Sequence, residues 1–415
     1  MRPVQFLFAL VLTGIAITGC TSVQDSTSAP TTSTTSTPVA PPEPVDRPTT
    51  IRIGLAVNES APTAEFDAEI QRILTETIAI LADDSSLNVE LTTLNVETPG
   101  QAEGSIAALV QNGVSVVITG CDDTTIPSVV EATTASQLLA ATGCIALPRP
   151  DIDLSEGEID ADLFLDLSSL ADNARAIASY ATTQSLGSLG IIRSTLLPDV
   201  ERTCLDLQEE LLAAGGSSPV QVNAEAVFAE LVDAPADVVA TLQAAAAQAE
   251  GGELDAFVVC ALPPTVGDVV ASLRAAGFTQ PVIVPWYGDT QSWAEDANNV
   301  VVITPASRYG DDPEVRTTDL FEALAVDDQV ADAVDVVTAD ALAILVDTAL
   351  RAESVGSRRL AETIADAASS AEIEGVSGVL RTGGDDAAPV ERTYRVISIE
   401  NGEPAFSTLT SAFDR

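Results

Sequence analysis

Histidine and lysine are absent from this 415-residue sequence, and all 18 basic residues are arginine. Without histidine, Ser-His-Asp and Cys-His nucleophile systems cannot form, and histidine-ligated zinc or haem sites are excluded as well. Without lysine, Schiff-base chemistry and the lysine of phosphate-binding loops are excluded. Aromatic residues are also scarce, with two Trp, four Tyr and ten Phe. Many common catalytic centres are therefore unavailable to this chain.

Positive charge is scarce relative to negative charge, because 62 acidic residues give a formal net charge of −44. Nucleic acid is not expected as a partner, since its phosphates would be repelled. The acids leave carboxylate-pair hydrolysis open, although no acidic pair stands in a recognised catalytic setting. A solvated, salt-tolerant surface is the plainer explanation for the large number of acidic residues. We expect no enzyme activity, no cofactor and no metal site.

The first twenty residues have the pattern of a lipoprotein signal peptide. Arg2 precedes an apolar run at residues 6–17, which is too short to be a stable membrane anchor. Ile17-Thr18-Gly19-Cys20 resembles a lipobox, in which Cys20 receives a lipid and becomes the mature N-terminus. Residues 21–50 are rich in Ser, Thr and Pro and are expected to form a disordered tether. An ordinary signal peptide with an incidental Cys20 is the alternative.

The rest of the chain alternates between short apolar segments and helical patterns. The first series predicts helices at about 66–81, 103–112 and 126–141, and strands at 51–57, 88–96, 114–119 and 144–147. The second series predicts helices at 171–183, 200–214, 236–249 and 266–276, and strands at 189–193, 220–226, 254–260 and 281–285. Two tandem series of this kind indicate an α/β fold with two doubly wound parallel-sheet lobes.

A third segment follows the two series. It predicts a long helix at 330–352, a shorter one at 358–368, an extended stretch at 375–382, and a hairpin whose first strand covers 392–399. Asn401-Gly402 is placed at the hairpin turn, because this dipeptide suits a tight two-residue connection.

Four cysteines remain after Cys20. An even number in an exported chain suggests disulfides, and three pairings are possible. The order of the expected elements favours two bonds, one in each lobe; they are Cys121–Cys144 and Cys204–Cys260. Buried free thiols are the alternative.

Several stretches, taken in order along residues 51–415, carry a family resemblance. The most specific is 375–385, followed by 394–397 and Asn401-Gly402; the others are 51–57, 113–120, 163–168 and 187–192. This series resembles the type I periplasmic solute-binding proteins, closest to the branch that binds leucine, isoleucine, valine and related molecules. The loop at 58–61 and the stretch at 82–86 depart from the pattern of that branch.

The resemblance implies two lobes joined by a three-stranded hinge. One lobe would comprise residues 51–165 and 306–388, and the other residues 166–305 and 389–415. It implies a lipid-anchored protein on the extracytoplasmic face of the cell membrane. This protein would close around a small polar ligand, an amino acid or a related molecule, and pass it to the membrane permease of an ABC importer. A sensor or regulator of cell-envelope enzymes with the same fold is the alternative.

The expected ligand site lies outside the carboxyl ends of the strands, where open parallel sheets bind their ligands. The loops there supply polar, charged and aromatic side chains, which are Asn58, Ser60, Asp122, Asp123, Thr124, Arg149, Arg193, Ser194, Trp286, Tyr287 and Asp289.

Structural roles compete with ligand binding at these positions. Asp122 and Asp123 favour a cationic ligand group, or they cap the following helix. Trp286 and Tyr287 offer an aromatic wall to a ligand, or they belong to the core of the lobe. Arg193 suits a ligand carboxylate, or it forms an ion pair within the protein.

Replacing the expected lipidation residue tests the anchoring directly. We expect Cys20→Ser to release the protein from the membrane fraction or to leave it unprocessed, because the lipid acceptor is lost. Membrane fractionation and the mass of the mature protein are the measurements. An unchanged distribution together with an unchanged mature mass would contradict the lipoprotein hypothesis.

Overall fold

The computed structural model describes residues 49–84, 87–143, 163–165, 171–193, 198–213, 220–223, 254–290, 292–325, 332–367, 372–382 and 390–411. Residues 47–415 form one compact unit, to which the following description refers. The expected signal peptide and all but the last two residues of the expected tether lie outside the described residues. Among the described residues, no helix combines the length and the apolar character needed to cross a membrane.

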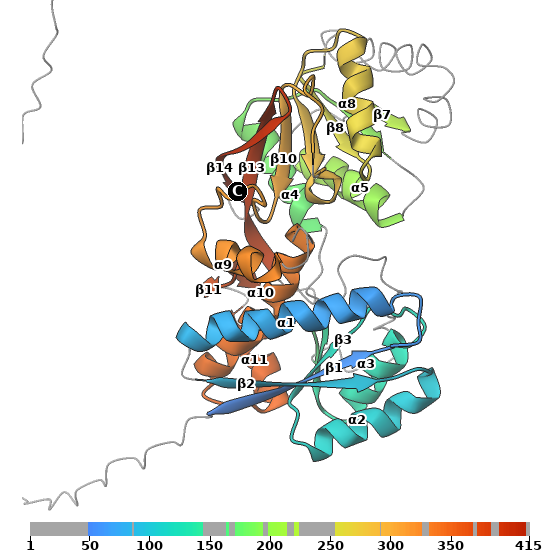
Figure 1. Cartoon of the computed structure of the whole chain (residues 1–415), viewed down its shortest axis with the longest axis vertical. Helices are drawn as coiled ribbons and strands as arrows, with labels where there is room; N and C mark the ends of the chain where they lie inside the picture. The colour runs from blue at the N-terminus through green and yellow to red at the C-terminus, as the bar shows by residue number, and fades with distance from the viewer. Residues whose placement is uncertain are drawn as a thin grey trace, which may run out of the picture. The chain divides into compact units, whose positions relative to one another are not determined.

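The first sheet has five parallel strands in the order β2-β1-β3-β4-β5 (Figure 1). Its strands are β1 (Thr50–Val57), β2 (Asn88–Asn95), β3 (Val116–Thr119), β4 (Leu139–Thr142) and β5 (Phe164–Leu165). Strands β3 and β4 are buried along their whole length, as expected of a parallel sheet covered on both faces. The sequence predicted β3, because residues 114–119 form a continuous apolar run.

Helices cover both faces of the first sheet. One face packs in a single core with α1 (Ala64–Asp84), α9 (Val315–Leu324), α10 (Ala333–Ala352) and α11 (Ser357–Ala367). The other face packs against α2 (Ala102–Gln111) and α3 (Ile126–Ala135). Three of the helices on the first face therefore come from residues 315–367, far along the sequence from the strands that they cover.

The fourth strand does not lie where the sequence predicted it. A helix was expected at 126–141, but α3 ends at Ala135 and β4 spans Leu139–Thr142; the strand expected at 144–147 lies outside the described residues. Gln137 adopts a left-handed φ of 58°, and the amides of Gln137 and Leu138 donate to the carbonyls of Thr134 and Thr133. This hydrogen-bonding pattern ends a helix and turns the chain without a glycine, so the sequence carried no visible stop signal.

The second sheet has parallel strands from the second series in the order β10-β9-β8-β6-β7. They are β6 (Leu189–Arg193), β7 (Val220–Asn223), β8 (Ala256–Cys260), β9 (Val282–Pro285) and β10 (Val300–Thr304). One face packs in a core with α4 (Ala171–Thr183) and α5 (Pro198–Ala213), and the other packs against α8 (Thr265–Ala275). Neither β10 nor α9 was predicted as an element, although the apolar run of β10 is visible in the sequence.

One expected disulfide is confirmed in this half of the chain. Cys204 of α5 and Cys260 at the end of β8 are bonded, with their Cα atoms 6.2 Å apart. Cys121 is disulfide-bonded as well. Its expected partner Cys144 lies outside the described residues, so the Cys121–Cys144 pairing stays a prediction.

The C-terminal hairpin completes the second sheet. Strands β13 (Val390–Glu400) and β14 (Glu403–Ser411) are joined by Asn401-Gly402, both with positive φ, which confirms the predicted turn. β13 also pairs antiparallel with β10 and with β12 (Val379–Thr382), which in turn pairs with β11 (Glu372–Glu374).

The chain passes between the two cores after Ile303 and again between Leu380 and Tyr394, where residues 383–389 lie outside the described residues. Ile303 belongs to a core of the second sheet, whereas Ala306 belongs to a core of the first. Leu380 belongs to the first and Tyr394 to the second. The lobe boundaries stay a prediction, because the expected crossings at 166–168 and 387–389 lie outside the described residues.

A buried ion pair lies beside these crossings. Two nitrogens of Arg395 donate to the two carboxylate oxygens of Asp312 over 3.0 and 2.8 Å, and both side chains are 1% exposed. Asp312 also accepts the backbone amides of Ser307 and Glu314, at 2.6 and 2.9 Å. Arg395 donates in addition to the carbonyl of Ser377. The pair therefore holds β13, the loop at 305–314 and the turn between β11 and β12 in one arrangement.

Removing one member of this pair tests its importance. We expect Arg395→Met to lower the free energy of unfolding by about 3–5 kcal/mol, because Asp312 would be left as an uncompensated buried charge. The double variant Arg395→Met/Asp312→Leu should be less destabilised than the single variant. Urea unfolding measures both. As a control, Arg359→Met breaks an exposed pair with Glu362 and should cost less than about 1 kcal/mol. Equal effects at Arg395 and Arg359 would contradict the role of the buried pair.

Candidate functional site

Hydrogen bonds join several predicted site residues at the carboxyl ends of β1 and β3. The side-chain amide of Asn58 donates to Asp122 Oδ2 over 2.6 Å, and Asn58 is buried. Asp122 also accepts the amide and hydroxyl of Thr124 and the hydroxyl of Thr125. Ser60 lies beside Asn58, since its amide donates to Asn58 Oδ1 over 3.1 Å. The carboxylate of Asp122 thus organises the loop that leads into α3, but it does not cap the helix, because the N-cap is Thr125 and no side chain caps it.

Asp67 of α1 belongs to the same cluster and was not predicted. Its carboxylate accepts the backbone amides of Asn58, after β1, and Cys121, after β3. Gly120 is required at this point, because a Cβ there would lie 2.5 Å from Asp67 Oδ1. The sequence offered one signal: Asp67 lies three residues before Ile70, on the apolar side of the helix, where an acid needs a buried partner.

The two carboxylates differ in their electrostatic environment. Burial raises the pKa of Asp67, and hydrogen bonds from Asn58 and Cys121 offset this only in part. Burial also acts on Asp122, but its hydrogen bonds from Asn58, Thr124 and Thr125 bring the pKa below the usual value. Asp122 is therefore an ionised carboxylate with several donors from its own lobe, which disfavours a ligand carboxylate at the same place.

A cavity of about 370 Å³ lies at the carboxyl ends of β8, β9 and β10. Its volume is within the range of small-molecule sites. Trp286 and Tyr287, whose rings meet edge to face with centroids 5.7 Å apart, form one wall. The remaining lining comes from the same strand ends, the loop after β10 and the start of α10; these residues are Leu262, Pro263, Asp289, Thr304, Ala306, Arg308, Asp332, Ala333 and Val334.

Three charged groups give the cavity its polarity. Tyr309 donates its hydroxyl to Asp289 Oδ1 over 2.6 Å, and burial raises the pKa of both groups. Arg308 has only 10% of its side chain exposed, and its nitrogen is 3.7 Å from Asp332 Oδ2. One guanidinium thus lies among carboxylates beside an aromatic wall, and a ligand carboxylate there would compete with Asp332 for Arg308.

The structure separates the predicted site residues into two groups. Trp286, Tyr287 and Asp289 line the cavity, whereas the cluster around Asn58 and Asp122 supplies none of its lining. Arg193 ends β6, and Asp123 is exposed beside Asp122. Arg149 and Ser194 lie outside the described residues. Trp286 and Tyr287 also pack against the core with α4 and α5, as the alternative expected, and their contact with a ligand stays a prediction.

Arg308 and Asp332 are cavity residues that the sequence reasoning missed. Arg308 follows the buried strand β10 by four residues, which was a usable signal once that strand was recognised. Asp332 is the N-cap of α10, but the expected helix began at residue 330, so this position was taken as part of the helix. Arg308 and Asp332 come together only through tertiary packing, so no local sequence pattern predicts their contact.

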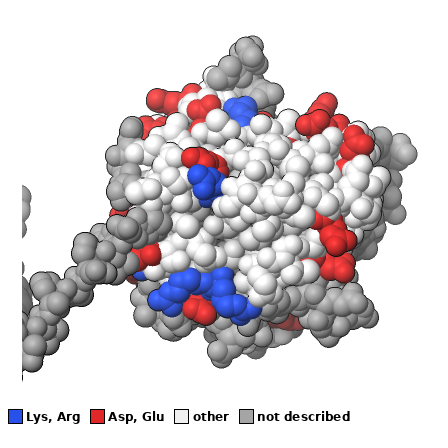
Figure 2. Space-filling view, turned by 90° about the horizontal axis from the view of Figure 1, so that it is seen from below, with Lys and Arg blue, Asp and Glu red and all other residues white. Residues whose placement is uncertain are grey.

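Negative charge is spread widely over the molecule and does not by itself mark a site. Figure 2 shows one face on which acidic side chains gather near the border and uncharged atoms cover most of the centre. Within the part of the chain that the structure describes, no group of three or more His, Cys, Asp or Glu residues is arranged to hold a metal ion.

The start of α10 contains an acid with an unusual titration. Asp332 and Asp335 form a reciprocal capping box, in which Asp335 accepts the amide of Asp332 over 2.8 Å. Burial, and then the nearby charge of Asp332, raise the pKa of Asp335 to about 7. The charge of Glu69 in α1 also contributes to this rise in the pKa of Asp335, and the charge of Arg72 opposes it.

The pH dependence of stability tests this assignment. With a pKa of about 7, the native protein keeps the Asp335 proton to a higher pH than the unfolded chain, in which an aspartate has its ordinary pKa of 3.8. The native state therefore binds more protons in this window, so this group makes the free energy of unfolding fall as the pH rises from about 4 to about 7. We expect Asp335→Asn, which keeps an acceptor for the cap, to show a smaller fall in urea unfolding across this range. Parallel curves for the two proteins would show that Asp335 titrates normally.

Comparison with known proteins identifies the fold. No protein-family model matches the sequence, and no curated protein matches it. A provisionally assigned branched-chain amino acid ABC transporter protein from Rhodospirillum rubrum matches with a TM-score of 0.68 and 13% identity, over 86% of this chain and 100% of that one. An ABC transporter substrate-binding protein from Sphaerobacter thermophilus matches with a TM-score of 0.61 and 16% identity, over 88% and 99%.

A third solved structure carries a bound ligand. A solute-binding protein of an ABC transporter from Rhodopseudomonas palustris, in complex with 3,4-dihydroxybenzoic acid, matches with a TM-score of 0.57 and 14% identity, over 88% of this chain and 98% of that one. With its two sheets and their covering helices, the chain has the type I periplasmic binding protein fold that the sequence resemblance implied.

Proposed function

We propose that this protein is an extracytoplasmic solute-binding protein that closes around a small ligand and passes it to the membrane permease of an ABC importer. Anchoring through a lipid on Cys20 would keep it at the membrane surface. The shared fold supports the binding role, because the similar structures named above include substrate-binding proteins of ABC transporters. Closure of the hinge between the lobes would hold the ligand, and the ligand would undergo no chemical reaction.

The cavity beside Trp286 carries this proposal. It joins an aromatic wall, a nearly buried arginine and the hydrogen-bonded acid Asp289 at the strand ends where open sheets bind ligands. A ligand with an apolar or ring-shaped part would pack on Trp286 and Tyr287, and its carboxylate would pair with Arg308. Amino acids and small aromatic acids both meet this description.

The cluster at Asn58 and Asp122 supports a restriction on the ligand. Asp122 is ionised and engaged with donors of its own lobe, so a ligand group that approaches it should be neutral or cationic. An amino group or a hydroxyl would suit this end, and the carboxylate would face Arg308.

Calorimetry with a panel of amino acids and small aromatic acids tests the site. For whichever compound binds, we expect Trp286→Ala and Arg308→Met each to weaken binding by about 1–3 kcal/mol, because each removes a stacking or charge-assisted contact. Leu409→Ala is the control, since this apolar side chain is 48% exposed on β14 and outside the cavity. Equal affinities in all four proteins would place the site elsewhere. Failure of every compound to bind would favour a sensor or regulator of cell-envelope enzymes.

A further inference from the structure

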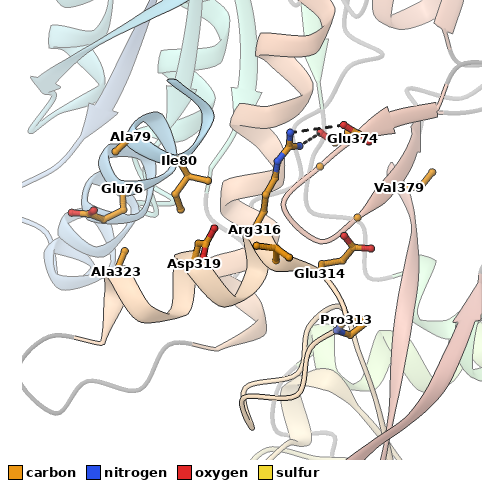
Figure 3. A pocket seen from close by; sticks show the side chains of 13 residues that line it. Glu76, Ala79, Ile80, Pro313, Glu314, Arg316, Asp319, Ala323, Glu374 and Val379 are labelled. Carbon is orange, nitrogen blue, oxygen red and sulfur yellow. Dashed lines mark hydrogen bonds and ion pairs between the residues drawn. The ribbon is translucent and has the colours of Figure 1, made fainter. Parts of the chain in front are cut away.

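A second hollow among the described residues lies apart from the ligand cavity. It has a volume of about 840 Å³ and runs between α1, α9 and the turn that joins β11 and β12 (Figure 3). It shares no lining residue with the cavity. We call it the groove; its lining is Glu76, Ala79, Ile80, Pro313, Glu314, Val315, Arg316, Asp319, Ala323, Glu374, Gly375, Gly378 and Val379.

Acidic side chains predominate in the groove. Four carboxylates face one guanidinium, and Arg316 reaches across to Glu374, with 3.8 Å between its nitrogen and Glu374 Oε2 (Figure 3). Glu76, Glu314 and Asp319 add three further negative charges that no second arginine in the lining balances. The groove therefore favours a positively charged occupant.

An exposed apolar side chain lies among these acids. Val315, in the first turn of α9, is 71% exposed, the highest value among the large hydrophobic residues that the structure describes as exposed. Ala79, Ile80, Ala323 and Val379 add further apolar side chains to the lining. A lining that mixes apolar and charged side chains is typical of a surface that contacts another protein, and it is not needed for binding a simple ion.

The walls of the groove are fixed before anything binds. The β11–β12 turn is held by Asp340, which accepts the amides of Val376 and Ser377, and by Thr317, whose hydroxyl donates to the carbonyl of Val376 over 2.8 Å. Gly378 has a φ of +96°, and a Cβ there would lie 3.0 Å from Glu314 Oε1. A rigid groove loses little conformational entropy on binding, which favours a specific partner.

We propose that the groove is a docking site for a basic segment of a partner protein, with its arginine or lysine side chains on the carboxylates and an aliphatic side chain on Val315. A second copy of this chain does not fit, because its formal net charge of −44 would repel the first. The docking site is separate from the proposed solute site, so either proposal can fail without the other.

The test must separate the groove from general attraction to an acidic protein. The probe is a fluorescent nine-residue peptide of alternating Arg and Leu, and fluorescence anisotropy at 0.15 M salt measures its binding to the full chain. The groove variant is Glu314→Gln/Asp319→Asn/Glu374→Gln. The matched control removes three exposed carboxylates outside the groove and changes the net charge equally; it is Glu103→Gln/Glu295→Gln/Glu403→Gln.

We expect the groove variant to bind the peptide roughly tenfold more weakly than the control variant, with thermal unfolding confirming that both fold. Val315→Ser, which keeps every charge, should weaken binding several-fold. Equal losses in the two triple variants would overturn the proposal and show only general electrostatic attraction. An unchanged affinity of Val315→Ser would overturn the aliphatic contact and leave a purely electrostatic groove.

Discussion

The carboxylate of Asp312 is the point on which both proposed functional surfaces depend. It is paired with Arg395 in a fully buried setting and accepts the amides of Ser307 and Glu314. Ser307 precedes Arg308 of the cavity, and Glu314 lines the groove. One charge pair therefore fixes the loop whose two ends serve the cavity and the groove. Taking such a pair out of water is costly, and the cost is offset only because each partner is surrounded by further hydrogen bonds.

The scarcity of positive charge bears on the polarity of the cavity and of the cluster around Asp122. Arginine supplies every positive charge in the chain, and most described arginines pair with acids or donate to backbone carbonyls. Arg308 also pairs with an acid, Asp332, but it lines a cavity in which Asp289 accepts the hydroxyl of Tyr309. At the other cluster, Asp122 is satisfied by donors from its own lobe. These two environments give the proposed ligand an orientation, with its carboxylate toward Arg308.

Continuous apolar runs made much of the fold predictable from the sequence. β1, β3, β6 and β9 lie within two residues of their expected positions, and the Asn401-Gly402 turn was anticipated. β4 was missed because Leu-Ala-Ala-Thr has no strand signature and Gln137 ends α3 without a glycine. At the proposed site, Trp286 and Tyr287 were predicted because they directly follow an expected strand. Arg308 and Asp332 were missed because only tertiary packing brings them together.

The central claim is that the cavity beside Trp286 holds a small ligand, and native mass spectrometry of the freshly purified protein tests it most directly. The account predicts an adduct of small-molecule mass that denaturation releases and that Trp286→Ala and Arg308→Met both reduce. An adduct that persists undiminished in both variants would contradict the assignment of the cavity. A protein that carries no adduct and gains none on incubation with amino acids or small aromatic acids would contradict the solute-binding claim itself.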